Sequence, residues 1–191
     1  MLLRLMLALL WSPACWAAQI YGTGGGKYFS TSRNPEYEIT GVRVTRGALG
    51  ILRSIQVKYG PSWDTVYGNK LPGDTQEFIL SPGEHIIQIW GSYKTFLRSL
   101  TLYTDKGRFA TFGRDDGAST FIVYPNKEWE VLKVVCGQYK LLGLTGLCFE
   151  WAVTLGFQVK SGPNDSLIPR APLAAAGLTH GPPGDHKRKC C

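Results

Sequence analysis

The chain has 191 residues, of which 44% are hydrophobic, and its 21 basic and 14 acidic side chains give a net charge of +7. The hydrophobic share allows a buried core and excludes a chain that is disordered throughout. Its 23 glycines, 11 prolines and charged fraction of 18% argue against a helical bundle or coiled coil, which would need many more Ala, Glu and Lys residues. These totals favour a loop-rich β protein with a basic surface, and three histidines are too few for chemistry that needs several of them.

Residues 1–17 have the features of a secretory signal peptide. Arg4 supplies a short positive region, and the apolar run of residues 5–11 is too short to span a bilayer. Cys15 and Ala17 put small residues at the two positions that signal peptidase inspects, so we expect cleavage after Ala17 rather than a membrane anchor, and no membrane span beyond it. Removal of this leader would take Arg4 with it, lower the net charge from +7 to +6, and place the chain in an oxidising compartment where disulfides persist.

The other end of the chain changes composition at about Ser161. Residues 161–191 are rich in Pro, Gly and Ala, end in a basic run and show no strand or helix period, which predicts a flexible basic tail. Asn164 opens an N-glycosylation acceptor pattern. Cys190 and Cys191 are predicted to form intermolecular disulfides, which would link two copies into a dimer.

Between these ends, residues 18–160 predict a single all-β domain. Period-two alternation recurs in short segments bounded by turn residues: 38–44, 54–59, 76–80, 85–90, 98–103, 108–112, 119–124, 130–136 and 147–155. Such regular spacing indicates an antiparallel sandwich, barrel or prism. No segment sustains a helical apolar stripe, which argues against an α/β fold.

A weak internal repeat favours three related units. Gly91-Ser92-Tyr93-Lys94 and Gly137-Gln138-Tyr139-Lys140 each end one strand and precede another, and residues 59–63 form a looser third copy. The repeat would fit a pseudo-threefold arrangement of small sheets. The alternative is that Gly-aromatic pairs recur by chance in a glycine-rich β protein.

The inventory of reactive side chains predicts that the protein is not an enzyme and holds no metal or cofactor. His85 is the single histidine of the strand region, and we interpret it as a solvated strand residue rather than part of a triad or metal site. Asp115 and Asp116 stand in a turn, where Asp is favoured for local hydrogen bonds. Counting alone does not exclude a two-carboxylate glycosidase, but nothing singles out a pair.

The glycine-rich string from Gly22 to Lys27 is a candidate binding loop. It lacks the Ser or Thr that follows the lysine of a phosphate loop, and no helix pattern follows it. It offers backbone N–H groups and close approach to a ligand, which suits a sugar, and Lys27 adds positive charge at the rim.

Several strings in the same order resemble animal jacalin-related lectins of the zymogen granule protein 16 group, and most of all its homolog B branch with the salivary demilune and parotid proteins. The strings are residues 21–30, 39–44, 56–60, 104–109, 112–117 and 149–151, and the resemblance covers about residues 19–155. It implies a β-prism I of three four-stranded antiparallel Greek-key sheets with pseudo-threefold symmetry. It also implies a sugar site at one end of the prism.

The resemblance assigns three loops to that site. The glycine loop would supply Gly24, Gly25, Gly26 and Lys27; the recognition loop (residues 91–95) would supply Ser92, Tyr93 and Lys94; the binding loop (residues 137–145) would supply Tyr139, Lys140, Leu141 and Thr145. Mannose-binding members carry a Gly-x-x-x-Asp motif in the binding loop. Counted back from Trp151, Leu141 holds the Gly position and Thr145 the Asp position. Loss of one hydrogen bond to a charged group costs about 1.5–3 kcal/mol, so we expect mannose binding to be weak or absent.

Cys136 and Cys148 flank the binding loop symmetrically about Leu142. In a hairpin they would lie opposite each other, where a cross-strand disulfide fits. The alternative is a pair of free buried thiols, because cysteine packs well in cores.

The basic excess completes the functional prediction. Lys27, Arg33, Lys94 and Lys140 would lie near the site and attract sulfated glycosaminoglycans, mucin glycans or microbial surface sugars, although the charge could serve solubility alone. We predict a secreted lectin-like protein that reaches the outside through secretory granules of exocrine tissue, with nucleic acid excluded as a partner. The alternative is a signalling factor that keeps the prism as a scaffold and binds a receptor protein.

Overall fold

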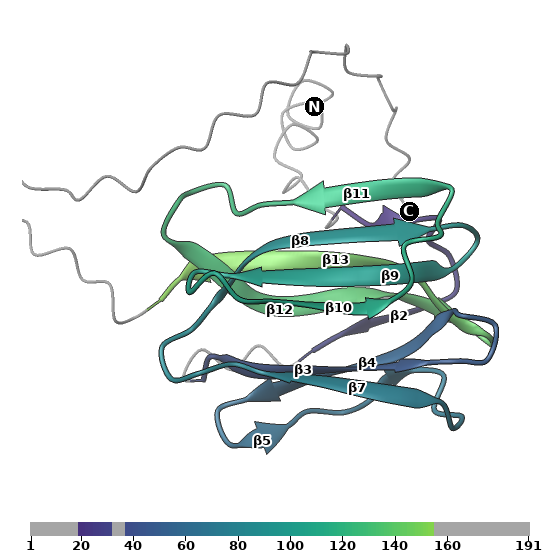
Figure 1. Ribbon diagram of the computed structural model, residues 1–191, viewed down its shortest axis with the longest axis horizontal. Coiled ribbons are helices and arrows are strands. Elements are labelled where there is room, and N and C mark those ends of the chain that lie inside the picture. Colours follow the sequence, from purple (N-terminus) through teal and green to yellow (C-terminus); the bar gives the residue numbers. More distant parts are fainter. Residues whose placement is uncertain (1–18, 32–36, 155–191) are drawn as a thin grey trace, which may run out of the picture. The chain divides into compact units, whose positions relative to one another are not determined.

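The computed structural model describes residues 19–31 and 37–154, which belong to one compact unit, Ala18–Phe157 (Figure 1). The predicted leader, the tail with Asn164, Cys190 and Cys191, and the side chain of Arg33 lie outside the described residues. The expectations for them therefore stay predictions. Within the described part, no helix is long and apolar enough to cross a membrane.

All regular structure in the described residues is β-strand. The strands are β1 (Tyr21–Gly22), β2 (Lys27–Ser30), β3 (Ile39–Arg46), β4 (Leu52–Tyr59), β5 (Ser62–Trp63), β6 (Tyr67–Gly68), β7 (Asp74–Ile79), β8 (Ile86–Tyr93), β9 (Leu97–Thr104), β10 (Phe109–Gly113), β11 (Ser119–Val123), β12 (Glu130–Lys140) and β13 (Gly143–Val153). Each of the nine predicted segments overlaps one of these strands. The four short strands β1, β2, β5 and β6 were missed. For β1 and β2 the reason is that the glycine-rich stretch between them carries no alternation and their pairing partners lie more than 100 residues away.

The strands form three antiparallel sheets (Figure 1), with the orders β1-β13-β12-β2, β10-β9-β8-β11 and β5-β4-β3-β7. In the third sheet β5 and β6 pair with different halves of β4, so together they fill the place of one strand. Each sheet has a central hairpin with a strand added on either side, which is the Greek-key order. The first sheet is completed by the N-terminal strands β1 and β2. The predicted three four-stranded Greek-key sheets are thus confirmed.

The central hairpins supply most of one shared hydrophobic core. Their inward positions alternate with outward ones, as a half-buried strand requires. The core draws fully buried side chains from all three sheets: Val42, Leu52, Ile55, Val57, Ile89, Leu97, Leu100, Leu102, Val135, Leu144 and Leu147. Because all three sheets contribute to it, no sheet can bury its apolar face alone.

The internal repeat holds for two of its three copies. Tyr93 and Lys140 end β8 and β12, whose hairpin turns are residues 94–96 and 141–142. The equivalent turn in the third sheet is residues 47–51, between β3 and β4. The proposed third copy, residues 59–63, instead joins β4 to β5 and is therefore wrong.

His85 is not a solvated strand residue. Its side chain is only 12% exposed, and its two ring nitrogens lie 2.8 Å from Asp105 Oδ2 and 2.9 Å from Glu38 Oε2. Lys133 Nζ pairs with Glu38 at 3.3 Å. Alternation along one strand could not reveal these partners, because each comes from a different part of the chain.

The carboxyl of Glu84 is buried beside Arg108. It accepts hydrogen bonds from Thr104 Oγ1 at 2.6 Å, the Ser81 N–H at 2.7 Å and Arg108 Nη1 at 2.6 Å. Burial alone would raise the pKa of Glu84, but these hydrogen bonds and the Arg108 charge outweigh it and lower the pKa from 4.5 to about 2. Glu84 therefore stabilises the fold fully above pH 4.5, and this contribution is lost as the pH falls toward 2.

We expect the Glu84→Gln variant to lose this acid sensitivity. In urea denaturation across this pH range, the free energy of unfolding of the wild type should fall more steeply with acid than that of the variant. Glu77→Gln is the matched control, because Glu77 forms an exposed ion pair with Arg43 on β3 and should leave the slope almost unchanged. Parallel profiles for wild type and Glu84→Gln would contradict the assignment.

Candidate functional site

Five turns meet at one end of the three sheets. Thr23 Oγ1 donates to the Thr95 carbonyl at 2.8 Å, which joins the stretch before the glycine loop to the recognition loop. Arg98, just after the recognition loop, donates from Nη1 to the Leu49 carbonyl at 2.7 Å and so reaches the β3–β4 turn. We call this set of turns, residues 22–26, 47–51, 69–73, 94–96 and 141–142, the loop end.

The remaining contacts close the loop end into a ring. The Asn69 side-chain amide donates to the Leu141 carbonyl, which ties residues 69–73 to the β12–β13 turn. The Gly24 N–H donates to the Thr145 carbonyl at 3.0 Å and returns the ring to the glycine loop. The three loops that the resemblance assigned to a sugar site are therefore neighbours in this structure.

The glycine loop is pressed against β12 and β13. Gly26 has φ +105°, and a Cβ added there would lie 2.2 Å from the Tyr139 carbonyl oxygen. Gly22 has φ +127°, and its added Cβ would lie 2.4 Å from the Thr145 carbonyl oxygen. Both positions require glycine for its backbone conformation and for the missing side chain.

Two backbone amides of the glycine loop are already engaged. Besides the Gly24 bond, the Gly25 N–H donates to Gln138 Oε1 at 2.6 Å. Gln138 is half-buried on β12, and its amide oxygen occupies the Gly25 N–H within the protein. The signal for Gln138 was present in the sequence, because it lies within the Gly-Gln-Tyr-Lys repeat.

Thr145 and Ser92 lie below the surface of the site. Thr145 is completely buried, and its Oγ1 donates to the Gly25 carbonyl at 2.7 Å, so it holds the glycine loop in place. Ser92 is also completely buried and is 2.7 Å from Ser99 Oγ. The half-buried ring of Tyr93 lies 6.4 Å from the Phe121 ring. These three predicted residues support the loops from beneath.

Five of the predicted residues, Gly26, Lys27, Tyr139, Lys140 and Leu141, line one hollow of about 760 Å³, which we call the lysine hollow. Its lining consists of Gly26, Lys27, Asn69, Lys70, Leu71, Tyr139, Lys140 and Leu141. Among the described residues no acidic side chain lines it. Residues 69–71 were not predicted as part of the site, because they reach it only through the fold. Lys94 is exposed but does not line this hollow. It lies near Asp116, whose pKa is lowered mainly by the hydrogen bonds from Arg98 and in smaller part by the Lys94 charge.

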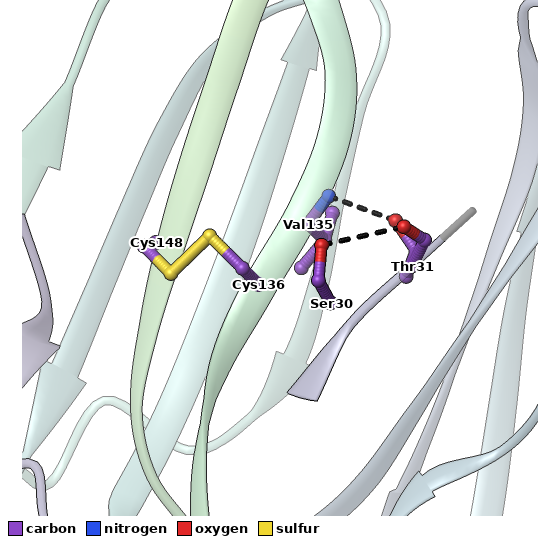
Figure 2. The surroundings of a disulfide bond; sticks show 5 residues. All are labelled: Ser30, Thr31, Val135, Cys136 and Cys148. Carbon is purple, nitrogen blue, oxygen red and sulfur yellow. Dashed lines mark hydrogen bonds between the residues drawn. A yellow bond between two sulfur atoms is a disulfide. The ribbon is translucent and has the colours of Figure 1, made fainter. Parts of the chain in front are cut away.

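Cys136 and Cys148 form the predicted disulfide. They are directly opposite in the β12–β13 register, with a Cα–Cα distance of 4.8 Å, and both are completely buried. Figure 2 shows the bridge between the two strands beside Ser30 at the end of β2. Thr31 Oγ1 accepts from the Val135 N–H at 3.1 Å and fastens β2 to the same strand. The base of the binding loop is thus held covalently.

Three sheets around one core and a ring of loops at one end define a jacalin-type lectin. Residues 18–144 match the jacalin-like lectin domain, and the chain belongs to that family. The crystal structure of a prostate-specific WGA16 glycoprotein lectin is similar, with 48% identity, a TM-score of 0.65, and coverage of 71% of this chain and 97% of that one. The artocarpin–mannotriose complex, at 20% identity and a TM-score of 0.60, shows the same fold. The predicted β-prism is confirmed.

Curated relatives point to the same group. Human zymogen granule membrane protein 16 is 42% identical over 119 residues, which are 62% of this chain and 70% of that protein. The prostatic spermine-binding protein of Mus musculus is 39% identical over 113 residues, or 59% of this chain. The matched region spans only about half of the spermine-binding proteins, 56% in Mus musculus and 53% in Rattus norvegicus.

Proposed function

We propose that this protein is a secreted, non-enzymatic lectin that binds anionic or complex glycans at the lysine hollow in preference to simple mannose. Membership of a lectin family supports carbohydrate binding. The observation that carries the glycan class is the lining of the lysine hollow, which includes Lys27, Lys70 and Lys140 together with Tyr139 and Leu141. Sulfated glycosaminoglycans, mucin glycans and microbial surface sugars carry the matching negative charge.

The interior of the site argues against simple mannose. The position where mannose-binding relatives have an Asp is held by Thr145, which is buried and donates to the Gly25 carbonyl. A buried hydroxyl used in this way cannot replace a carboxylate that accepts from sugar hydroxyls. The Gly24 and Gly25 amides are also occupied within the protein.

The relatives support a route through secretory granules. Three of them are named for the zymogen granule membrane, in Homo sapiens, Rattus norvegicus and Mus musculus. The disulfide agrees with an oxidising compartment. We therefore propose that the protein is stored in granules and released. The name of the spermine-binding relatives refers to a polycation, which the positive lysine hollow would repel.

Exposed leucines favour a second candidate function, docking of a receptor protein. Leu71, Leu141 and Leu142 are 57%, 83% and 48% exposed at the loop end. Apolar side chains grouped on a surface are typical of protein contacts. In that case the prism would be a scaffold that has lost sugar binding, and the receptor would cover Leu71 and Leu141 in the lining of the lysine hollow.

Retention on immobilised heparin tests the proposed function. The Lys27→Ala/Lys140→Ala variant should bind about tenfold more weakly, because two exposed charge contacts of up to about 1 kcal/mol each are removed. Lys106→Ala is the control, since Lys106 lies outside the lysine hollow and donates to the Pro82 carbonyl. A glycan array with neutral and sulfated sugars then ranks the ligands. The proposal would be refuted if Lys27→Ala/Lys140→Ala and the Lys106→Ala control eluted from heparin alike, or if the protein bound firmly to mannose alone.

A further inference from the structure

A second hollow at the loop end is lined by arginines. It has a volume of about 700 Å³, and its charged residues are Arg46, Arg53, Arg98 and Arg114 with Asp74 and Asp116. We call it the arginine hollow. Four positive and two negative charges leave it with a net charge of +2. No sequence pattern pointed to it, because its arginines come from β3, β4, β9 and the segment after β10.

Arg98 is the fixed part of this hollow. Its Nε and Nη2 donate to the two carboxylate oxygens of Asp116 at 2.7 and 2.8 Å, and its side chain is only 17% exposed. Its Nη1 donates to the Leu49 carbonyl. Arg98 therefore neutralises Asp116 and holds the β3–β4 turn, which shapes one wall before any ligand arrives.

Arg53 and Arg114 keep their hydrogen-bonding capacity. Among the described residues, the Arg53 side chain donates only from Nη1, to the Pro72 carbonyl at 2.5 Å, although a guanidinium has five N–H groups. Gly47 makes room for it, because a Cβ there would lie 2.5 Å from Arg53 Nε. Arg114 is exposed, and its side chain makes no hydrogen bond or ion pair with another described residue. Arg53 is held in place by Pro72, and both guanidinium groups keep N–H groups without acceptors among the described residues, which suits an incoming anion.

The fork of a guanidinium matches the oxygens of a sulfate or carboxylate in a bidentate way that a lysine does not.

The two hollows also share a wall. In the segment 69–73, Lys70 and Leu71 line the lysine hollow, while Pro72 and Gly73 line the arginine hollow. A chain that carries an anionic group at intervals could therefore enter both.

We propose that the arginine hollow is a second glycan subsite, which takes a sulfate group of the same linear sulfated chain whose neighbouring part occupies the lysine hollow. This inference rests on the proposed function, and it makes a linear polyanion the substrate class. Arg53 and Arg114 contact the sulfate, and Arg98 is a positioning residue. Two subsites on one chain raise affinity because the second contact is intramolecular.

The test uses the full chain and a series of heparin oligosaccharides of increasing length, with affinity measured by titration calorimetry at several salt concentrations. The variant is Arg53→Gln/Arg114→Gln, and the control is Lys106→Gln/Lys127→Gln, which removes two exposed charges outside both hollows. The first variant should bind long oligosaccharides about tenfold more weakly and release about one or two fewer ions. Its affinity for the shortest oligosaccharide that binds should match that of the wild type.

Further measurements distinguish a failure of the second subsite from a failure of the proposed function. If Arg53→Gln/Arg114→Gln matches its control at every length while Lys27→Ala/Lys140→Ala still weakens binding, the second subsite is refuted and the proposed function stands. If the wild type binds no heparin, both are refuted. If desulfated heparin, which keeps its carboxylates, binds as well as heparin, the assignment of a sulfate group to the arginine hollow is refuted. Binding to phosphatidylserine vesicles that needs the two arginines, without a length effect on heparin, would assign the hollow to a membrane surface instead. Arg114→Gln alone repeats the test without breaking any contact of the described fold.

Discussion

Replacing Cys136 and Cys148 together by alanine is expected to lower the free energy of unfolding by about 3 kcal/mol. The disulfide closes a loop with a sequence separation of 12 residues, and in the chain-entropy model a loop of about this size contributes about 3 kcal/mol by restricting the unfolded chain. Urea denaturation of the variant against the oxidised wild type measures the difference. The loss is large for a domain of this size, whose total stability is about 5–15 kcal/mol.

The control for this prediction is the wild type treated with a mild reductant in its native state. Both sulfurs are completely buried, so the bridge should resist reduction until the protein unfolds. A loss below about 1 kcal/mol in the double variant would contradict the prediction, because the bridge would then add little restriction to the unfolded chain. Heparin retention of the double variant, measured below its unfolding transition, would then report whether the loop keeps its shape.

Gly26→Ala is expected to cost at least about 2 kcal/mol of stability and to abolish most of the glycan affinity. Its φ of +105° disfavours any side chain, and the added Cβ would lie 2.2 Å from the Tyr139 carbonyl oxygen and 2.9 Å from Lys140 Cγ. The Tyr139 carbonyl belongs to the backbone of β12, so it cannot move aside for the new methyl group as a flexible side chain would. The glycine loop must therefore move away from β12, which separates Lys27 from Lys140.

Gly83→Ala is the matched control for Gly26→Ala. Gly83 also has a positive φ, +64°, but an added Cβ meets nothing within 4 Å. Its cost should be limited to the backbone conformation, about 1–2 kcal/mol, with no effect on heparin retention. Thermal unfolding and heparin elution of both variants compare the two effects. Equal binding by Gly26→Ala and wild type would place the glycine loop outside the site.

The sequence predicted the strand segments because alternation within a strand is a local property. It predicted the disulfide for a similar reason, since Cys136 and Cys148 are equally spaced from the centre of one hairpin. The glycine loop could also be found, because consecutive glycines are readable without a structure. Each of these features depends on residues that are close in the chain or on a simple spacing.

The side chains of the site could not be sorted from the sequence. Ser92, Tyr93 and Thr145 were expected at the surface with Lys27 and Lys140, but Ser92 and Thr145 are buried and support the loops. Alternation says which face a residue takes within a strand. It does not say whether a turn from another sheet covers that face at the end of the strand.

What the sequence by itself determined is the class of fold, the pairing of its two central cysteines and the position of the glycine loop. What only the tertiary structure decided is the composition of the two hollows. Residues 69–73 reach the binding loop across more than 70 positions of sequence, as the Asn69–Leu141 bond shows. Arg53 and Arg114 reach the same hollow from different sheets. Contacts of this kind exist only when three sheets close around one core, because that closure brings the ends of unrelated strands to the same place.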